Sequence, residues 1–97
     1  MMTASEESIK RLLEETLAAH SVYETTVLGG VYDEDWSDWY AAYLLKHGLP
    51  GLLPHHSAIS AARLGAILKQ LDAGFLRERP EGEWPAYYAK RLSAALE

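Results

Sequence analysis

Two copies of one aromatic phrase place the strongest constraint on how this chain folds. Residues 34–44 read EDWSDWYAAYL and residues 82–92 read GEWPAYYAKRL, so the second copy follows the first at a shift of 48 positions. The aligned pairs are Trp36/Trp84, Trp39/Tyr87, Tyr40/Tyr88, Ala41/Ala89 and Leu44/Leu92. In each copy the large side chains recur at the spacing of one face of a short helix. Each aromatic ring removes ~150–250 Å² from water, which anchors a short helix onto a longer one.

The shift also pairs residues that precede each aromatic phrase. The pairs are Tyr23/Leu71, Glu24/Asp72, Val27/Phe75 and Leu28/Leu76. We therefore interpret the chain as one helical domain over residues 1–97, with an internal repeat at about 9–47 and 57–95. Each unit is a long helix, an acidic turn and a short aromatic helix. The predicted fold class is all-α, a four-helix domain built from two similar helical hairpins.

Apolar periodicity and helix-ending residues set the expected boundaries of the four helices. Gly29-Gly30 ends the first helix, and Gly48 with Pro50 ends the second. The stretch GLPGLLPHHS, residues 48–57, is interpreted as a connection whose leucines pack inward. The helices are expected from 5 to about 28, from 35 or 36 to about 47, from about 57 to 76, and from Trp84-Pro85 onward.

Composition excludes several classes of protein and site. Cysteine is absent, which excludes disulfides and thiolate metal sites. The formal charge is −5 and the nine Lys and Arg form no basic stripe, so nucleic acid is not an expected partner. No apolar run approaches the ~20 residues that span a bilayer, and no membrane partner is expected. The first residues carry acids where a signal peptide has a basic start, so a cytoplasmic protein is expected.

A polar track interrupts the hydrophobic stripe of the first long helix. At about 100° per residue, Thr16, His20, Tyr23 and Glu24 fall near the centre of that stripe. His20 and Glu24 are four residues apart, so their side chains can meet. Three interpretations remain open: a hydrogen-bonded core pair, one wall of a small-molecule pocket, or half of a metal site. Because no second His/Glu set follows and only Asp72 matches Glu24, no metal and no cofactor is predicted.

The acidic turn YDEDWSD does not satisfy the requirements of a calcium loop. Position 38 is Asp where the loop needs Gly, and position 44 is Leu where it needs a bidentate Glu. We interpret Asp33 and Asp35 as helix N-caps. The adjacent His55 and His56 are expected in a solvated loop.

The stretch AAHSVYETTVLGGVYDEDWSDWYAAYL, residues 18–44, resembles a segment of small, mostly uncharacterised bacterial proteins. That segment joins an alanine-rich helix carrying H-x-x-Y/H-E to D-x-x-W-P-x-W-Y-A-x-Y. It is also similar to a tail found on some glyoxalase/bleomycin-resistance-type proteins. Ser37 departs from the usual proline, which returns at Pro85 in the second copy. The resemblance implies no activity, but it includes His20 and Glu24. The matching residues are Ala19, His20, Tyr23, Glu24, Gly30, Asp33, Trp36, Trp39, Tyr40, Ala41 and Tyr43.

No complete nucleophile, phosphate-binding or metalloprotease motif occurs in the chain. The sequence favours a non-catalytic helical interaction module, which forms a homodimer or binds another protein. The alternative is a small-molecule-binding protein or an enzyme, with His20 as acid/base and Glu24 as the group that orients it. The residues predicted for such a ligand site are His20, Tyr23, Glu24, Trp36, Trp39, Tyr40 and Tyr43.

Overall fold

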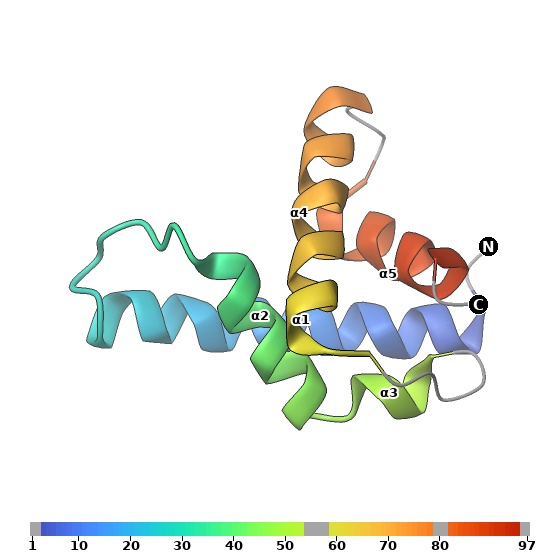
Figure 1. Ribbon diagram of the computed structural model, residues 1–97, viewed down its shortest axis with the longest axis horizontal. Helices are drawn as coiled ribbons and strands as arrows, with labels where there is room; N and C mark the ends of the chain where they lie inside the picture. Colours follow the sequence, from blue (N-terminus) through green and yellow to red (C-terminus); the bar gives the residue numbers. More distant parts are fainter. Residues whose placement is uncertain (1–2, 54–58, 79–81, 96–97) are drawn as a thin grey trace.

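The fold is all-α, as the sequence predicts. The computed structural model of the protein describes residues 3–53, 59–78 and 82–95, and every regular element in these residues is helical. The described residues contain five helices, one more than expected (Figure 1). They are α1 (Ala4–Thr26), α2 (Trp36–Lys46), α3 (Leu49–Leu52), α4 (Ala61–Glu78) and α5 (Trp84–Ala95).

Helix α1 begins one residue before the expected start because Thr3 caps it. The Thr3 hydroxyl accepts from the Glu6 N–H, and the Glu6 carboxylate accepts from the Thr3 N–H, which forms a capping box. At the other end, Gly29 and Gly30 adopt φ of 64° and 86°, a region open to glycine at little cost. The Gly30 N–H bonds back to the Glu24 carbonyl at 2.8 Å. The glycine pair therefore ends the helix, as predicted.

The additional helix α3 occupies the stretch that was expected to be a plain connection. Gly48 ends α2 with φ of 97°, and Pro50 then stands in the first turn of α3. Proline stops one helix but suits the start of the next, because its missing N–H has no partner there in any case. Leu49 and Leu53 are buried, which confirms that the leucines of this stretch pack inward. His55 and His56 lie outside the described residues.

Helix α4 begins later than the expected residue 57. The Ser60 hydroxyl accepts from the Arg63 N–H at 3.2 Å, and the Ser60 carbonyl accepts the first helical hydrogen bond. This side-chain cap places the start at Ala61. Helix α5 begins at Trp84 as predicted, with Pro85 in its first turn.

The four longer helices pair with partners that are not their neighbours in the sequence, an arrangement that we call crosswise packing. The most extensive contacts join α1 to α5 and α2 to α4, while α3 fills the space beside α1 and α2 (Figure 1). Each long helix thus packs chiefly against the short helix of the other expected hairpin. Helices within each expected hairpin contact one another less, and the hairpin description itself stays a prediction.

The core is formed by apolar residues from all five helices. At one point α2 comes very near α4, where a Cβ on Gly65 would lie 3.6 Å from the Ser37 carbonyl oxygen. Ser37 is completely buried there, and its hydroxyl has no hydrogen-bond partner among the described residues. None of the helices in the described part of the chain has the length and apolar character needed to cross a membrane. The buried apolar residues are Ile9, Leu12, Leu13, Tyr40, Ala41, Leu44, Leu49, Leu53, Leu64, Leu68, Leu71, Tyr88, Ala89 and Leu92.

Candidate functional site

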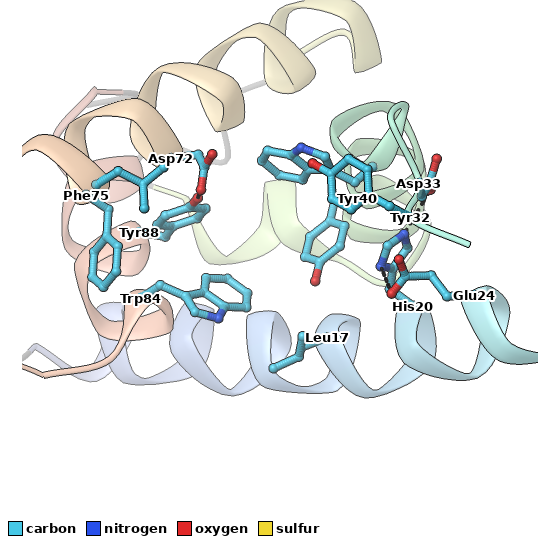
Figure 2. Close-up of a pocket in the computed structure, with 12 residues that line it drawn as sticks. Leu17, His20, Glu24, Tyr32, Asp33, Tyr40, Asp72, Phe75, Trp84 and Tyr88 are labelled. Atoms are coloured by element: carbon cyan, nitrogen blue, oxygen red, sulfur yellow. Dashed lines mark hydrogen bonds and ion pairs between the residues drawn. The ribbon is translucent and has the colours of Figure 1, made fainter. Parts of the chain in front are cut away.

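A pocket of about 480 Å³ opens between α1, the segment that leads into α2, and the helices α2, α4 and α5. Figure 2 shows the acidic and imidazole groups at its two ends, with Tyr40 between them. We call the two ends the His20 end and the Asp72 end. The lining residues are Leu17, His20, Glu24, Tyr32, Asp33, Trp36, Tyr40, Asp72, Phe75, Leu76, Trp84 and Tyr88.

At the His20 end, one buried imidazole lies between two carboxylates. His20 is only 5% exposed. Its Nε2 lies 2.9 Å from Asp33 Oδ2, and its Nδ1 lies 3.5 Å from Glu24 Oε1. A neutral imidazole donates through one nitrogen only, whereas an imidazolium donates through both. Each ring nitrogen of His20 thus has a carboxylate oxygen nearby that can accept a hydrogen bond from it.

The local fold explains why these three residues meet. His20 and Glu24 are four apart on α1 and share one face of the helix. After the turn at Gly29 and Gly30 the chain runs back towards α1, so that Asp33 reaches the His20 imidazole. Asp33 is held in place because its Oδ1 accepts the Asp35 N–H at 2.9 Å while Oδ2 faces His20.

This geometry corrects the N-cap interpretation of the acidic turn. Asp35 stands at the N-cap position of α2, but its side chain makes no capping hydrogen bond. Asp33 lies outside the helix, and its carboxylate is used by the turn and by His20. Thr16 is completely buried on the predicted face of α1, and its hydroxyl donates to the Leu12 carbonyl at 2.7 Å, so it takes no part in the His20 cluster. Such back-bonding satisfies a buried hydroxyl within its own helix.

At the Asp72 end, a carboxylate from α4 meets a tyrosine from α5. The Tyr88 hydroxyl donates to Asp72 Oδ1 at 3.3 Å. Burial raises the pKa of Tyr88 strongly, and the nearby Asp72 carboxylate adds to the shift. Burial also raises the pKa of Tyr40 to about 12, with a further contribution from the charge of Glu24. Both phenols therefore stay protonated to a higher pH than an exposed tyrosine does.

Aromatic rings from the two copies of the phrase form the walls between the two ends. Trp36 meets Tyr40 edge to face, with ring centroids 5.6 Å apart. Trp84 meets Tyr88 in the same manner at 4.9 Å. The Tyr40 and Trp84 rings, 6.1 Å apart, join the two pairs. The rings therefore form one continuous cluster across α2 and α5.

Four of the seven predicted ligand-site residues line this pocket: His20, Glu24, Trp36 and Tyr40. The other three, Tyr23, Trp39 and Tyr43, do not line it. They form a row of rings, in which Trp39 lies 4.9 Å from His20 and 5.3 Å from Tyr43. Tyr23 and Trp39 pack against the imidazole, and Tyr43 stacks on Trp39.

Sequence reasoning missed the second half of the pocket, although the signal was present. Asp72, Trp84 and Tyr88 are the residues that the 48-position shift aligns with Glu24, Trp36 and Tyr40. All six line the same pocket. Asp33 was also missed as a partner of His20, even though the resemblance pattern contains both residues.

The described residues do not assemble a metal site. Glu24 and Asp33 face different nitrogens of one imidazole, and Asp72 lies at the other end of the pocket. Within residues 3–53, 59–78 and 82–95, no three His, Asp or Glu side chains are grouped so that they could hold a metal ion.

Comparison of the chain with family models, with curated proteins and with solved structures finds no match in any of the three. The candidate site therefore rests on its own geometry.

Proposed function

We propose that the protein binds a small molecule in the pocket between the His20 end and the Asp72 end. One observation carries the proposal: polar groups from three separate segments border a single aromatic pocket. His20 and Glu24 come from α1, Asp33 from the connecting segment, and Asp72 from α4. Pockets of ~300–1,000 Å³ with apolar walls and a few converging polar groups are typical of ligand sites.

The distribution of exposed apolar residues supports the same proposal. Leu17, Tyr32 and Leu76 all line the pocket, yet they are 43%, 69% and 64% exposed. Large apolar side chains at the mouth of a pocket remain in water unless a ligand covers them. The proposal stops at binding, because no nucleophile with an activating base stands among the described lining residues.

The test is an NMR titration that uses the three tryptophans as separate reporters. Trp36 and Trp84 line the pocket and Trp39 does not, so their indole N–H signals distinguish pocket binding from nonspecific contact. The protein would be titrated with a panel of small acids, neutral alcohols and amides, and amines. At least one compound is expected to shift the Trp36 and Trp84 signals while it leaves the Trp39 signal nearly unchanged.

Two matched variants strengthen the test. Leu17→Trp fills the pocket from α1, whereas Val22→Trp makes a similar change at an exposed α1 residue that does not line the pocket. Binding should be lost in the first variant and kept in the second. If no compound of any class shifts the two pocket signals, or if both variants bind equally well, the proposal is wrong.

Self-association is a second candidate function, favoured by a different observation. Val22, Val27 and Val31 are 61%, 65% and 66% exposed, and all three lie near the end of α1 and the segment after it. A dimer would cover such side chains. Sedimentation velocity over a hundredfold range of protein concentration tests this candidate. We expect a dimer that Val27→Ser and Val31→Ser together weaken; a monomer at every concentration would exclude it.

A further inference from the structure

We propose that the ligand of this pocket is a small organic cation, a quaternary ammonium or a protonated amine. This inference rests on the proposed function and names its ligand class. Three features of the pocket carry it: the sign of its charged groups, the chemistry of its walls, and the placement of its hydroxyl groups.

The charged groups of the pocket are acidic. Three carboxyl groups, those of Glu24, Asp33 and Asp72, line it together with the single imidazole of His20. No Lys or Arg is among the described lining residues. Even with the imidazole protonated, three carboxylates leave an excess of negative charge, which repels anions and attracts cations.

The walls of the pocket suit an organic cation better than a metal ion. Metal ions such as Ca²⁺ and Mg²⁺ require several oxygens that converge on one point. Here the carboxyl groups stand at opposite ends of the pocket, with aromatic rings between them (Figure 2). Trp36, Tyr40 and Trp84 supply π-systems within one cluster. Indole and phenol rings are the side chains that attract alkylated ammonium groups most strongly.

The Tyr40 hydroxyl indicates where the ligand lies. Tyr40 is only 6% exposed, and it lines the pocket. Tyr40 stands between the two ends of the pocket, 5.0 Å from the imidazole of His20 and 6.1 Å from the Trp84 indole by ring centroids. A phenol hydroxyl can donate to a ligand hydroxyl and can accept from an ammonium N–H. A small cation at the centre of the pocket would place such a group beside Tyr40.

The size of the pocket limits the ligand to a small molecule. A volume of about 480 Å³ equals roughly sixteen water molecules at the ~30 Å³ each occupies in the liquid. A trimethylammonium head with a short polar or aromatic substituent fits that space. A long peptide or an oligonucleotide does not fit within it.

The experiment compares two probes of the same shape that differ in charge, choline and 3,3-dimethylbutan-1-ol. The second has a carbon atom in place of the ammonium nitrogen and is neutral. Both would be titrated by NMR at constant ionic strength, with the Trp36 and Trp84 indole signals as the readout. Choline is expected to bind with a Kd on the order of 1 mM, as suits a ligand of its size. The neutral probe is expected to bind at least about tenfold more weakly.

Isosteric variants locate the charge that matters. Glu24→Gln and Asp72→Asn each remove one carboxylate while they preserve the shape of the side chain. Each should weaken choline binding by about threefold to tenfold. Glu15→Gln is the matched control, because Glu15 is an exposed residue of the same helix outside the pocket. It should leave the Kd within about a factor of two.

The outcomes separate this inference from the proposed function. If the neutral probe binds as tightly as choline, or if neither pocket variant weakens choline binding, the cation assignment is wrong. Should only acids or neutral compounds from the wider panel shift the pocket signals, the proposed function stands and this ligand class falls. If no compound of the panel shifts them, both proposals are wrong.

Discussion

The two ends of the pocket differ in the buried residues that the neighbouring long helix, α1 or α4, places next to them. At the His20 end, α1 buries an imidazole between two carboxylates. Forty-eight positions later, α4 carries Leu68 where α1 carries His20, and Leu64 where α1 carries Thr16; both leucines are completely buried. The aromatic walls are alike in the two halves, but the long helices behind them are not. At these positions α1 therefore carries a polar cluster, whereas α4 carries tightly packed apolar residues.

Exchanging the residues that differ between α1 and α4 tests which polar groups each helix tolerates at these positions. The largest effect is expected when Leu68 is replaced by His, which puts the polar residue of α1 into α4. The substitution removes a buried leucine, and we expect the free energy of unfolding to fall by about 3 kcal/mol. Urea unfolding followed by circular dichroism measures this loss. A loss below about 1 kcal/mol would show that α4 accommodates a polar pair as readily as α1 does.

The reverse exchange, His20→Leu, should have a smaller effect. It leaves the largely buried Asp33 carboxylate without its imidazole partner, and we expect a loss of about 1–3 kcal/mol. Asp33→Asn is the companion variant, and the double variant completes a cycle. The double variant should lose less than the sum of the two single variants. Simple additivity would mean that the pair does not couple, and that its short distance contributes nothing to stability.

High pH should destabilise the protein through the tyrosines of the pocket. The pKa of Tyr40 is raised from 10.0 in the unfolded chain to about 12 in the folded protein. The stability that this shift provides is complete below pH 10 and is lost as pH rises from 10 towards 12, because only the unfolded state releases the proton there. We expect a loss on the order of 2 kcal/mol from this residue over that range.

Thermal unfolding between pH 9 and pH 11.5 measures the effect. Tyr40→Phe should flatten the decline in stability with pH, and Tyr88→Phe should flatten it similarly because the pKa of Tyr88 is also raised. Tyr32→Phe is the control, since Tyr32 is 69% exposed. An equal slope in all three variants would contradict the burial of the two phenols.

The smallest effect is expected at Ser37, which the 48-position shift aligns with Pro85. Its buried hydroxyl has no partner among the described residues, so Ser37→Ala removes a desolvated group and leaves the contact with Gly65 in place. We expect a gain of about 0.5–1 kcal/mol in the free energy of unfolding. The melting temperature measures it, and a clear decrease would indicate a water or side chain that satisfies the hydroxyl.

The sequence predicted the helical class and the places where helices end, because these depend on local signals. The aromatic spacing, the glycine pair at 29–30 and Trp84-Pro85 act within a few residues of one another. Helix α3 was not predicted, because a proline fits the first turn of a helix as well as it fits the residues just after one. Local patterns alone could not show which face of each element meets which partner.

The candidate site was predicted in part for the same reason. Helical spacing alone brings His20 and Glu24 together, so that contact was within reach of the sequence. The approach of Asp33 depends on how the chain returns after Gly30, and the approach of Trp84 depends on how α5 packs on α1. Both are tertiary properties. Trp36 and Tyr40 of α2 line the pocket, whereas Trp39 and Tyr43 of the same helix do not: Trp39 packs against the imidazole and Tyr43 stacks on Trp39.

The crosswise packing has a consequence for how the protein is made. Helix α1 has its principal partner in α5, which is synthesised well after α1. Closing a contact across most of the chain costs loop entropy before it returns any stability, so it forms late. The pocket needs Trp84 and Tyr88 from that later helix. A nascent chain that has not yet released α5 therefore carries His20, Glu24 and Asp33 without a pocket, and ligand binding would report that α5 has emerged and packed.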